Sequence, residues 1–503
     1  MSQLDRRLQQ RQLRDRLAAE FPDFELLNWY IQYRELKAAH PDTVLLYRLG
    51  DFYETFDDDA KLIAELLEVT LTYKKFANHK KNKTEQRAPM AGMPYHAIER
   101  YVSALVNAGY RVAIAEQVSE TASSKSDTRP RSVFAAGIEQ GERRRDIVDR
   151  EVVRVITPGT VIDSGMLAPT HNNYLVAVLA EGALVGVAYA DLSTGEFCCT
   201  EFAGERAAHQ AQGELARLQA SEVLVPDDPA LRLPGLDPSS AQLEHDLEFM
   251  TKGEREKLLP GERVARRVER ENVARWAHGH VTGWPGWRWK LNNAAEALQL
   301  QLRVHSLDGF GLRGKPLAVR AAGAIIQYIH ETQRNAASQI TTLRTYTNGG
   351  TMFLDPQTRR NLELLEGSSG KAKDALVGVL DHTRTPMGGR LLRRWISQPL
   401  IDLPQLRARQ DGVQRFFDDT LLRASVRDAL KHAGDLERVV NRVLQGITVA
   451  TPRDMVRLRD GLRALPALAG ALDGWLPPQA LDAPTPPASE PAREEDGAAW
   501  EWE

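Results

Sequence analysis

The first clear strand of this chain lies in Val44-Leu45-Leu46-Tyr47-Arg48-Leu49-Gly50-Asp51-Phe52-Tyr53-Glu54. The stretch begins as an apolar run short enough for one buried strand, and the pair Gly50-Asp51 then favours a turn. If the chain stays extended after the turn, Phe52 and Glu54 point to the same side, because residues two apart in a strand share a face. We therefore expect an aromatic ring and a carboxylate to project together just past the end of a strand.

This pair of side chains suits a flat, apolar target that carries a hydrogen-bond donor, and a base pair is such a target. An aromatic ring can wedge between stacked bases, and a carboxylate can accept a hydrogen bond from a base edge. The competing interpretation is structural: Phe52 belongs to the core and Glu54 is solvated, since phenylalanine is mostly buried and glutamate mostly exposed. On these residues alone the structural interpretation is the simpler one.

A wider resemblance changes this balance. Gly50-Asp51-Phe52-Tyr53-Glu54 resembles the Phe-x-Glu element of the MutS family of DNA mismatch-recognition ATPases. The resemblance extends over about residues 29–465 and stops before the family's ATPase domain. Further matches follow in the family's order: Pro89-Met90-Ala91-Gly92-Met93-Pro94-Tyr95-His96-Ala97, Ile156-Thr157-Pro158-Gly159-Thr160, Asp191-Leu192-Ser193-Thr194-Gly195-Glu196-Phe197, His305-Ser306-Leu307-Asp308-Gly309-Phe310-Gly311 and Thr383-Arg384-Thr385-Pro386-Met387-Gly388-Gly389-Arg390.

The resemblance implies a multidomain α/β plus α fold. Its parts are a small mixed α/β mismatch-recognition domain, a ribonuclease-H-like connector domain and a partial α-helical core and lever domain. A length of 503 residues agrees with about three domains. We expect an N-terminal helical extension over residues 1–25, the recognition domain over 26–120 and a linker with an insertion over 121–150. The connector is expected over 151–262, the helical part over 263–476 and a disordered tail over 477–503.

The resemblance implies that Phe52 unstacks a mispaired or bulged base and that Glu54 hydrogen-bonds to the displaced base. Residues 90–96 are expected to form a tight loop beneath the turn, with Met90, Gly92, Pro94 and His96 as supporting residues.

Residues 74–87 contain five lysines and one arginine against one glutamate and show no periodicity. This segment is either a solvated loop or an arm that contacts DNA phosphates. The arm would use Lys74, Lys75, Lys80, Lys81, Lys83 and Arg87, while Phe76 is expected to anchor the segment.

The hydrophobic pattern predicts the individual elements. Helices are expected over residues 26–40, 57–67 and 98–108, and strands over residues 69–73 and 112–115. Three consecutive strands over 174–179, 184–190 and 196–200, a helix over 205–220 and a strand over 222–225 predict a βββαβ order. Beyond residue 264, arginines on helices are interpreted as solvated. These helices are expected over 296–304, 318–334, 387–397, 403–417, 420–433 and 452–465, with an extended segment over 351–356.

The amino-acid composition limits which partners, metal sites and cell compartments are expected. The net charge of −3 gives no overall basic signal for nucleic acid and leaves the decision to local patches. The only cysteines, Cys198 and Cys199, supply neither a disulfide framework nor a CxxC metal site, which favours a reducing cytoplasm. We expect no membrane span and no signal peptide. The family resemblance adds association with the nucleoid.

Enzyme activity is not expected for this chain. Gly309-Phe310-Gly311-Leu312-Arg313-Gly314-Lys315 fits the start of a phosphate-binding loop, but Pro316 replaces the Ser or Thr that would bind Mg²⁺. ATP and Mg²⁺ therefore remain cofactors of full-length family members, and we expect neither a cofactor nor a metal here. The rival enzyme is a metal-dependent nuclease on the second α/β domain. Its carboxylate cluster is missing: residues 174–179 carry no acid, and Asp191 precedes a turn.

The expected partner is double-stranded DNA with a mismatch or a small loop. The resemblance also implies a homodimer and a mismatch-repair protein that binds through the connector. A second rival follows from this: the chain joins repair partners as an interaction module without clasping DNA by itself.

Overall fold

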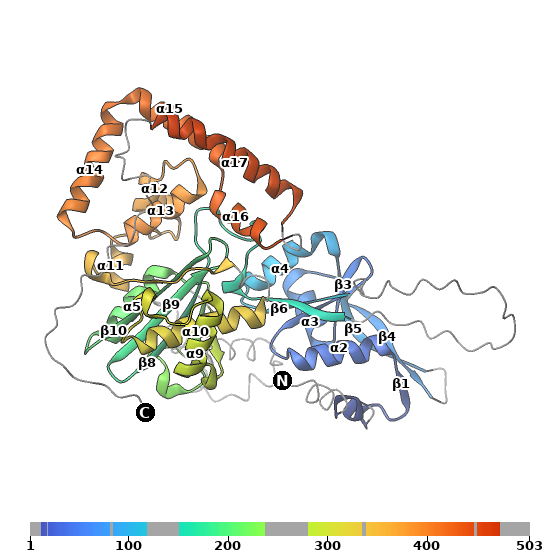
Figure 1. Ribbon diagram of the computed structural model, residues 1–503. Coiled ribbons are helices and arrows are strands. Elements are labelled where there is room, and N and C mark those ends of the chain that lie inside the picture. Colours follow the sequence, from blue (N-terminus) through green and yellow to red (C-terminus); the bar gives the residue numbers. More distant parts are fainter. Residues whose placement is uncertain are drawn as a thin grey trace, which may run out of the picture.

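The computed structural model describes residues 12–17, 19–80, 84–117, 150–236, 280–333, 339–446 and 450–472. Two sheets follow one another along the chain, and a group of helices lies beside the second sheet (Figure 1). The expected linker insertion and tail fall almost entirely outside the described residues. Within the described residues, no helix is both long and apolar enough to cross a membrane.

The first sheet has seven strands in the order β1-β4-β5-β3-β2-β6-β7. Strands β2 and β6 are parallel, and the other neighbours are antiparallel. The strands are β1 (Phe24–Leu26), β2 (Val44–Leu49), β3 (Phe52–Phe56), β4 (Thr72–His79), β5 (Glu85–Pro94), β6 (Val112–Gln117) and β7 (Arg150–Ile156).

Both faces of the first sheet are covered, which explains the unbroken apolar run of β2. Helix α2 (Asn28–Ala39) packs Tyr33 against Leu45 and Tyr47 on one face. Helices α3 (Asp57–Leu67) and α4 (Ile98–Asn107) cover Leu46 on the other face. The three aspartates in the first turn of α3 complement the helix dipole. The predicted helices of this domain are confirmed to within about two residues.

The lysine-rich segment is predicted to be either a solvated loop or an arm that contacts phosphates, but its described residues are mostly in strands. It forms the β4–β5 hairpin, in which Lys74 is opposite Ala88 and Lys75 is opposite Arg87. The register shifts between Lys75 and Ala77, so the hairpin lacks the strict alternation that marks a strand in sequence. Phe76 is buried against Tyr30 and anchors the hairpin as predicted. The strand expected over residues 69–73 begins at Thr72 instead.

The second sheet has the order β12-β11-β8-β9-β10-β13. The predicted βββαβ order is confirmed: in the chain, β8, β9 and β10 are followed by α5 and then β11. Helix α5 covers one face of the sheet, and helices α9 and α10 cover the other. The elements are β8 (Tyr174–Glu181), β9 (Leu184–Asp191), β10 (Glu196–Ala203), α5 (Ala207–Leu218), β11 (Glu222–Pro226), β12 (His280–Trp284), α9 (Leu291–Leu302), α10 (Pro316–Thr332) and β13 (Arg344–Thr345).

The limits of the second unit differ from those expected at residues 151 and 262. Strand β7 pairs with β6 and so completes the first sheet. Strand β12 pairs with β11, and α9 and α10 bury their apolar sides on the second sheet rather than in a helical core. The reason is physical: a helical repeat of apolar residues has the same period whether its partner is a sheet or another helix.

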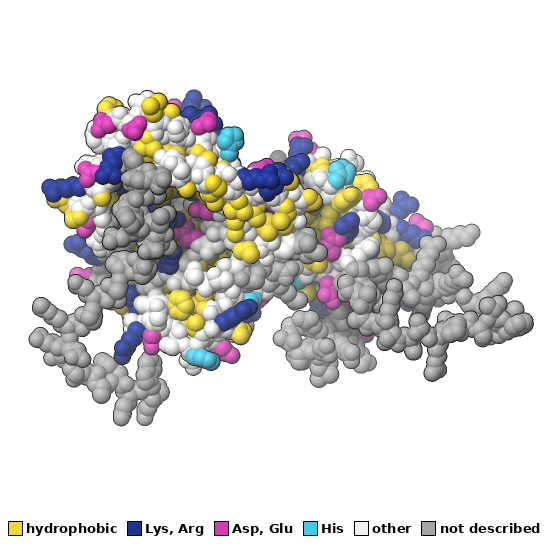
Figure 2. Space-filling view, turned by 45° about the horizontal axis from the view of Figure 1, so that its top comes forward, with side chains coloured by type: hydrophobic (Ala, Val, Ile, Leu, Met, Phe, Trp, Pro, Cys, Tyr) yellow, Lys and Arg dark blue, Asp and Glu magenta, His cyan; other side chains and the backbone are white. Residues whose placement is uncertain are grey.

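The helical part begins after the second sheet. Helices α14, α15 and α17 form an arch above α12, α13 and α16 (Figure 1). Figure 2 shows apolar side chains beside Lys and Arg side chains on this part of the surface. The exposed apolar residues include Val413, Phe417 and Leu421. The helices are α11 (Pro356–Asn361), α12 (Leu376–Leu380), α13 (Pro386–Ser397), α14 (Leu403–Asp418), α15 (Thr420–Ala433), α16 (Leu436–Leu444) and α17 (Pro452–Ala471).

Candidate nucleic-acid interface

Phe52 is the first residue of β3, directly after a tight turn from β2. Gly50 occupies the left-handed region of the backbone with φ +63°, a conformation that glycine adopts at no steric cost. The turn pairs Leu49 with Phe52 across the hairpin. Phe52 remains 47% exposed although it is a large apolar residue. The purely structural interpretation, in which Phe52 is a core residue, is therefore wrong.

Phe52 and Glu54 share one side of the sheet, as the sequence predicts. Glu54 is opposite Gly92, and Phe52 is opposite Pro94 on β5. A Cβ atom at Gly92 would lie 3.9 Å from the Phe52 ring and 4.0 Å from Cγ of Glu54. The aromatic ring and the carboxylate thus flank one small residue on the sheet surface.

The supporting residues come from β5, which replaces the expected tight loop. Met90 is opposite Phe56, so Met90, Gly92 and Pro94 run alongside β3. His96 follows in a short 3₁₀ turn (Tyr95–Ala97), and its ring lies edge-on to Tyr95. These residues form the surface beside Phe52 rather than a loop beneath it.

Glu54 is held by a lysine from the hairpin. Its carboxylate forms an ion pair with the Lys74 ammonium group. The Lys74 Nζ atom also lies 5.3 Å from the Trp29 ring and 5.8 Å from the Phe56 ring, within the range of cation–π attraction. The side chain of Glu54 is only 14% exposed. The ring of Phe52 is therefore open to solvent, whereas the carboxylate beside it is partly enclosed.

The other described cations of the hairpin have local acceptors. Lys75 Nζ lies 2.6 Å from a Glu85 carboxylate oxygen, and Arg87 lies 3.5 Å from the other oxygen. Lys80 donates to the carbonyl of Pro22 at 2.7 Å. Lys81 and Lys83 lie outside the described residues. Phosphate contacts by this segment stay a prediction.

The turn has further support that sequence reasoning missed. Arg48 forms an ion pair with Glu116 at 3.1 Å, and its guanidinium lies 5.1 Å from the exposed Tyr95 ring. The Tyr53 hydroxyl donates to the same Glu116. Burial, followed by this hydrogen bond, raises the pKa of Tyr53 to about 12. Glu116 lies on β6, far from the turn in sequence, and no local pattern signals this contact.

Comparisons with known proteins agree with this architecture. Three family models match the chain: MutS domain I at residues 29–165, MutS domain II at 173–341 and MutS domain III at 357–483. This chain belongs to the MutS family. The domain II match runs through α9 and α10, in agreement with the extent of the second sheet.

Curated relatives are similar over most of the chain. The DNA mismatch repair protein MutS of Roseiflexus sp. (strain RS-1) is 65% identical over 482 residues, which is 95% of this chain and 44% of the relative. The protein of that name from Chloroflexus aurantiacus is 58% identical over 457 residues, 90% of this chain and 47% of the relative. The one from Thermosynechococcus vestitus is 38% identical over 469 residues, 91% and 46%. The chain thus spans about half the length of these relatives.

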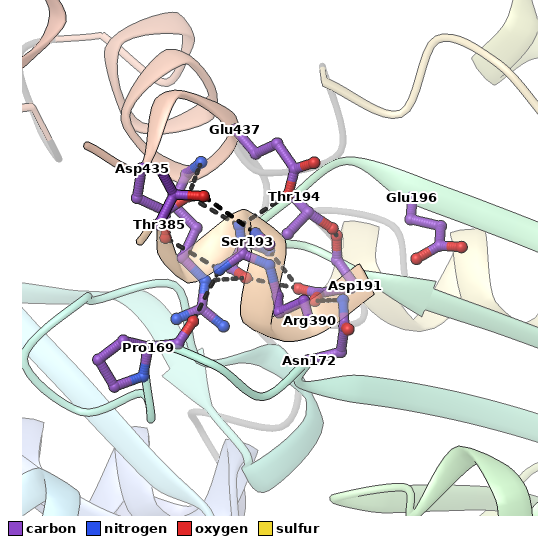
Figure 3. Close-up of polar contacts among 12 residues, drawn as sticks. Pro169, Asn172, Asp191, Ser193, Thr194, Glu196, Thr385, Arg390, Asp435 and Glu437 are labelled. Atoms are coloured by element: carbon purple, nitrogen blue, oxygen red, sulfur yellow. Dashed lines mark hydrogen bonds and ion pairs between the residues drawn. The ribbon is translucent and has the colours of Figure 1, made fainter. Parts of the chain in front are cut away.

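Asp191 of MutS domain II is a turn residue, as predicted. One carboxylate oxygen accepts from the Ser193 backbone and hydroxyl at 2.9 and 2.6 Å (Figure 3). The other accepts from the Asn172 side chain at 2.8 Å. The residues that the structure describes contain no cluster of three or more potential metal ligands. The geometry of Asp191 is that of a structural residue and gives no support to a two-metal nuclease.

The glycine-rich segment before α10 lacks the context of a phosphate-binding loop. Helix α9 precedes it and a 3₁₀ turn (Asp308–Phe310) includes its first residues, whereas such a loop requires a preceding strand. Pro316 is the first residue of α10, and its side chain has no hydroxyl group that could bind a metal ion. The turn interpretation of this segment is confirmed.

The junction of domains II and III contains buried arginines that the sequence led us to expect in solvent. Arg390 pairs with both oxygens of Asp435 at 2.7 and 2.9 Å and with Glu437 at 2.7 Å (Figure 3). It also donates to the carbonyl of Pro169, in the segment between the domain I and domain II matches, at 2.8 Å. Burial alone would lower the pKa of Arg390, but these two carboxylates raise it above its ordinary value.

A buried carboxylate contributes several hydrogen bonds to the connection between domains I and II. Glu222 accepts from the Thr157 hydroxyl at 2.5 Å and from the Gly159 amide at 3.0 Å. It also accepts from Thr282 at 2.8 Å and from the Tyr328 hydroxyl at 2.6 Å. The Ile156-Thr157-Pro158-Gly159-Thr160 motif is thus a capped turn that anchors the end of β7 to the second sheet.

Proposed function

We propose that this chain binds mismatched or bulged double-stranded DNA by inserting Phe52 at a weakly stacked base step. The observation that carries the proposal is the exposed Phe52 ring beside Glu54 on the surface of domain I. Leaving a large aromatic side chain in water is costly, which indicates a binding surface. A hydrogen-bond acceptor beside the ring suits a nucleic-acid base, which has hydrogen-bond donors, better than it suits a purely apolar partner. The mismatch-repair names of the curated relatives support the same target.

The energetic logic is indirect readout. A mismatch weakens stacking, so kinking the duplex there costs less than at a paired step. Unstacking costs a few kcal/mol, which contacts to phosphates must offset. The β4–β5 hairpin is the local candidate for those contacts, with Lys75, Lys80 and Arg87 among its described cations.

The test compares Phe52→Ala with Tyr73→Ala. Tyr73 is a matched control because it is an exposed aromatic residue of the same domain, at 61% exposure, and lies on β4 away from Glu54. We expect the unaltered chain to bind a duplex with one extra thymine at least about tenfold more tightly than the paired duplex, a difference of about 1.4 kcal/mol. Fluorescence anisotropy with both duplexes measures this ratio.

Phe52→Ala is expected to bring the ratio close to one and to leave weak, salt-sensitive binding. Tyr73→Ala should keep the ratio. An equal loss of affinity for both duplexes in Phe52→Ala would contradict a wedge, because it would mean that Phe52 supports binding without reading the defect.

A further inference from the structure

The ion pair of Glu54 crosses a whole strand. Glu54 lies on β3 and Lys74 on β4, and β5 runs between them in the sheet. A lysine side chain can reach across because β5 presents the small residues Ala88 and Gly92 opposite Lys74 and Glu54. This contact restrains both side chains, at a cost in side-chain entropy. Because it spans β5, it restricts their positions more than an ion pair between adjacent strands would.

Lys74 is held at this position from a second direction. Its ammonium group lies near the rings of Trp29 and Phe56, and its side chain is 32% exposed. An ammonium group has three donors and no acceptor, so the carboxylate must accept from it. The contact uses only Oε2 of Glu54. Within the described part of the chain, Oε1 makes no hydrogen bond and remains available as an acceptor.

We propose that Lys74 is a positioning residue that keeps Glu54 a hydrogen-bond acceptor, and thereby makes the site selective for displaced bases that present an N–H donor. Thymine N3–H and guanine N1–H are donors of this kind. A base without such a donor leaves the partly enclosed carboxylate unpaired, and sites of this type reject ligands that lack the matching group. This inference rests on the proposed function, since it assigns the base class that the same site reads.

The sequence alone suggested another role for Lys74, as one of several phosphate contacts. The two roles predict different results. A phosphate contact adds affinity for any duplex and increases the salt dependence of binding. A positioning residue changes which base is preferred and leaves the affinity for paired DNA nearly unaltered.

The experiment measures binding of the 503-residue chain to three duplexes by fluorescence anisotropy. One is fully paired, one has an extra thymine, and one has an extra N3-methylthymine, in which a methyl group replaces the N3 proton. The variants are Lys74→Met, which keeps an apolar stem over Trp29 without the charge, and Lys74→Arg, which keeps the charge. Lys75→Met is the matched control, because Lys75 is the adjacent lysine and its ammonium group forms an ion pair with Glu85 and not with Glu54.

We expect the unaltered chain to prefer thymine over N3-methylthymine by about tenfold, close to the lower end of the range for a lost hydrogen bond to a charged group. Lys74→Met should reduce this preference to about threefold or less. Lys74→Arg should retain it. Lys75→Met should retain this preference too, because the loss of a phosphate contact weakens binding to all three duplexes alike. All variants should still prefer the extra thymine over the paired duplex, because Phe52 is intact.

Three outcomes would overturn the inference. If Lys74→Met weakens binding to all three duplexes equally and lowers the salt slope by about one, Lys74 is a phosphate contact. If the unaltered chain does not distinguish the two extra bases while Phe52→Ala still abolishes defect preference, only the role of Lys74 is wrong. If no variant binds any duplex at about 100 µM, the weak end of ordinary non-specific binding, the proposed function fails as well.

Discussion

Arg438 illustrates how a single residue joins two domains of this chain. It lies on α16 and is 4% exposed. Its guanidinium donates to the Ser193 hydroxyl of domain II at 3.1 Å. It also donates to the carbonyls of Ala168 and His171, in the segment between the domain I and domain II matches, at 3.0 and 2.5 Å. Burial lowers its pKa below the ordinary value for arginine. The sequence pattern predicts no helix over residues 436–444 and so gives no sign of this contact, because a local pattern does not show which distant residues a side chain meets.

Replacing Arg438 by lysine should destabilise the chain by about 2–4 kcal/mol, because one ammonium group cannot reproduce a planar fork aimed at three acceptors. Arg453→Lys on the exposed side of α17 is the control, with an expected change within about 0.5 kcal/mol. Urea unfolding of both variants measures the difference. Equal midpoints for the two would show that the Arg438 contacts do not stabilise the junction.

At the scale of elements, α9 and α10 pack so closely that they depend on a glycine. A Cβ atom at Gly323 of α10 would lie 2.5 Å from Cα and 2.7 Å from the carbonyl oxygen of Ala294 on α9. Backbone atoms cannot give way as a flexible side chain can. The sequence predicts both helices, but the residues that bring two helices together act through contacts between distant positions, and periodicity does not report them.

Gly323→Ala should therefore lower stability by about 1–3 kcal/mol through overpacking. Gly412→Ala in α14 is the opposite case, since a Cβ atom there meets nothing within 4 Å. That change should stabilise the chain by up to about 1 kcal/mol through helix propensity. Thermal and urea unfolding distinguish the two signs. Destabilisation by both changes would mean that the local space around these glycines does not decide the outcome.

At the scale of the whole molecule, the sequence predicts which side chains meet when they are close along a strand. The shared side of Phe52 and Glu54 is confirmed because it follows from the period of a strand alone. The pairing of Glu54 with Lys74 is not predictable in that way, because it depends on a hairpin whose bulge breaks the period. The limits of domain II are not predictable for a different reason: β12 pairs with a strand more than fifty residues earlier, and a local pattern does not show such a partner.

The central claim is that Phe52 unstacks a base, and the most direct test is the fluorescence of 2-aminopurine placed next to an extra thymine in a duplex. This analogue is quenched by stacking and brightens when its neighbour is displaced. At saturating protein, we predict a clear rise in fluorescence with the unaltered chain and no rise with Phe52→Ala. A rise of equal size with both proteins, or saturation of the unaltered chain with no rise at all, would contradict the wedge.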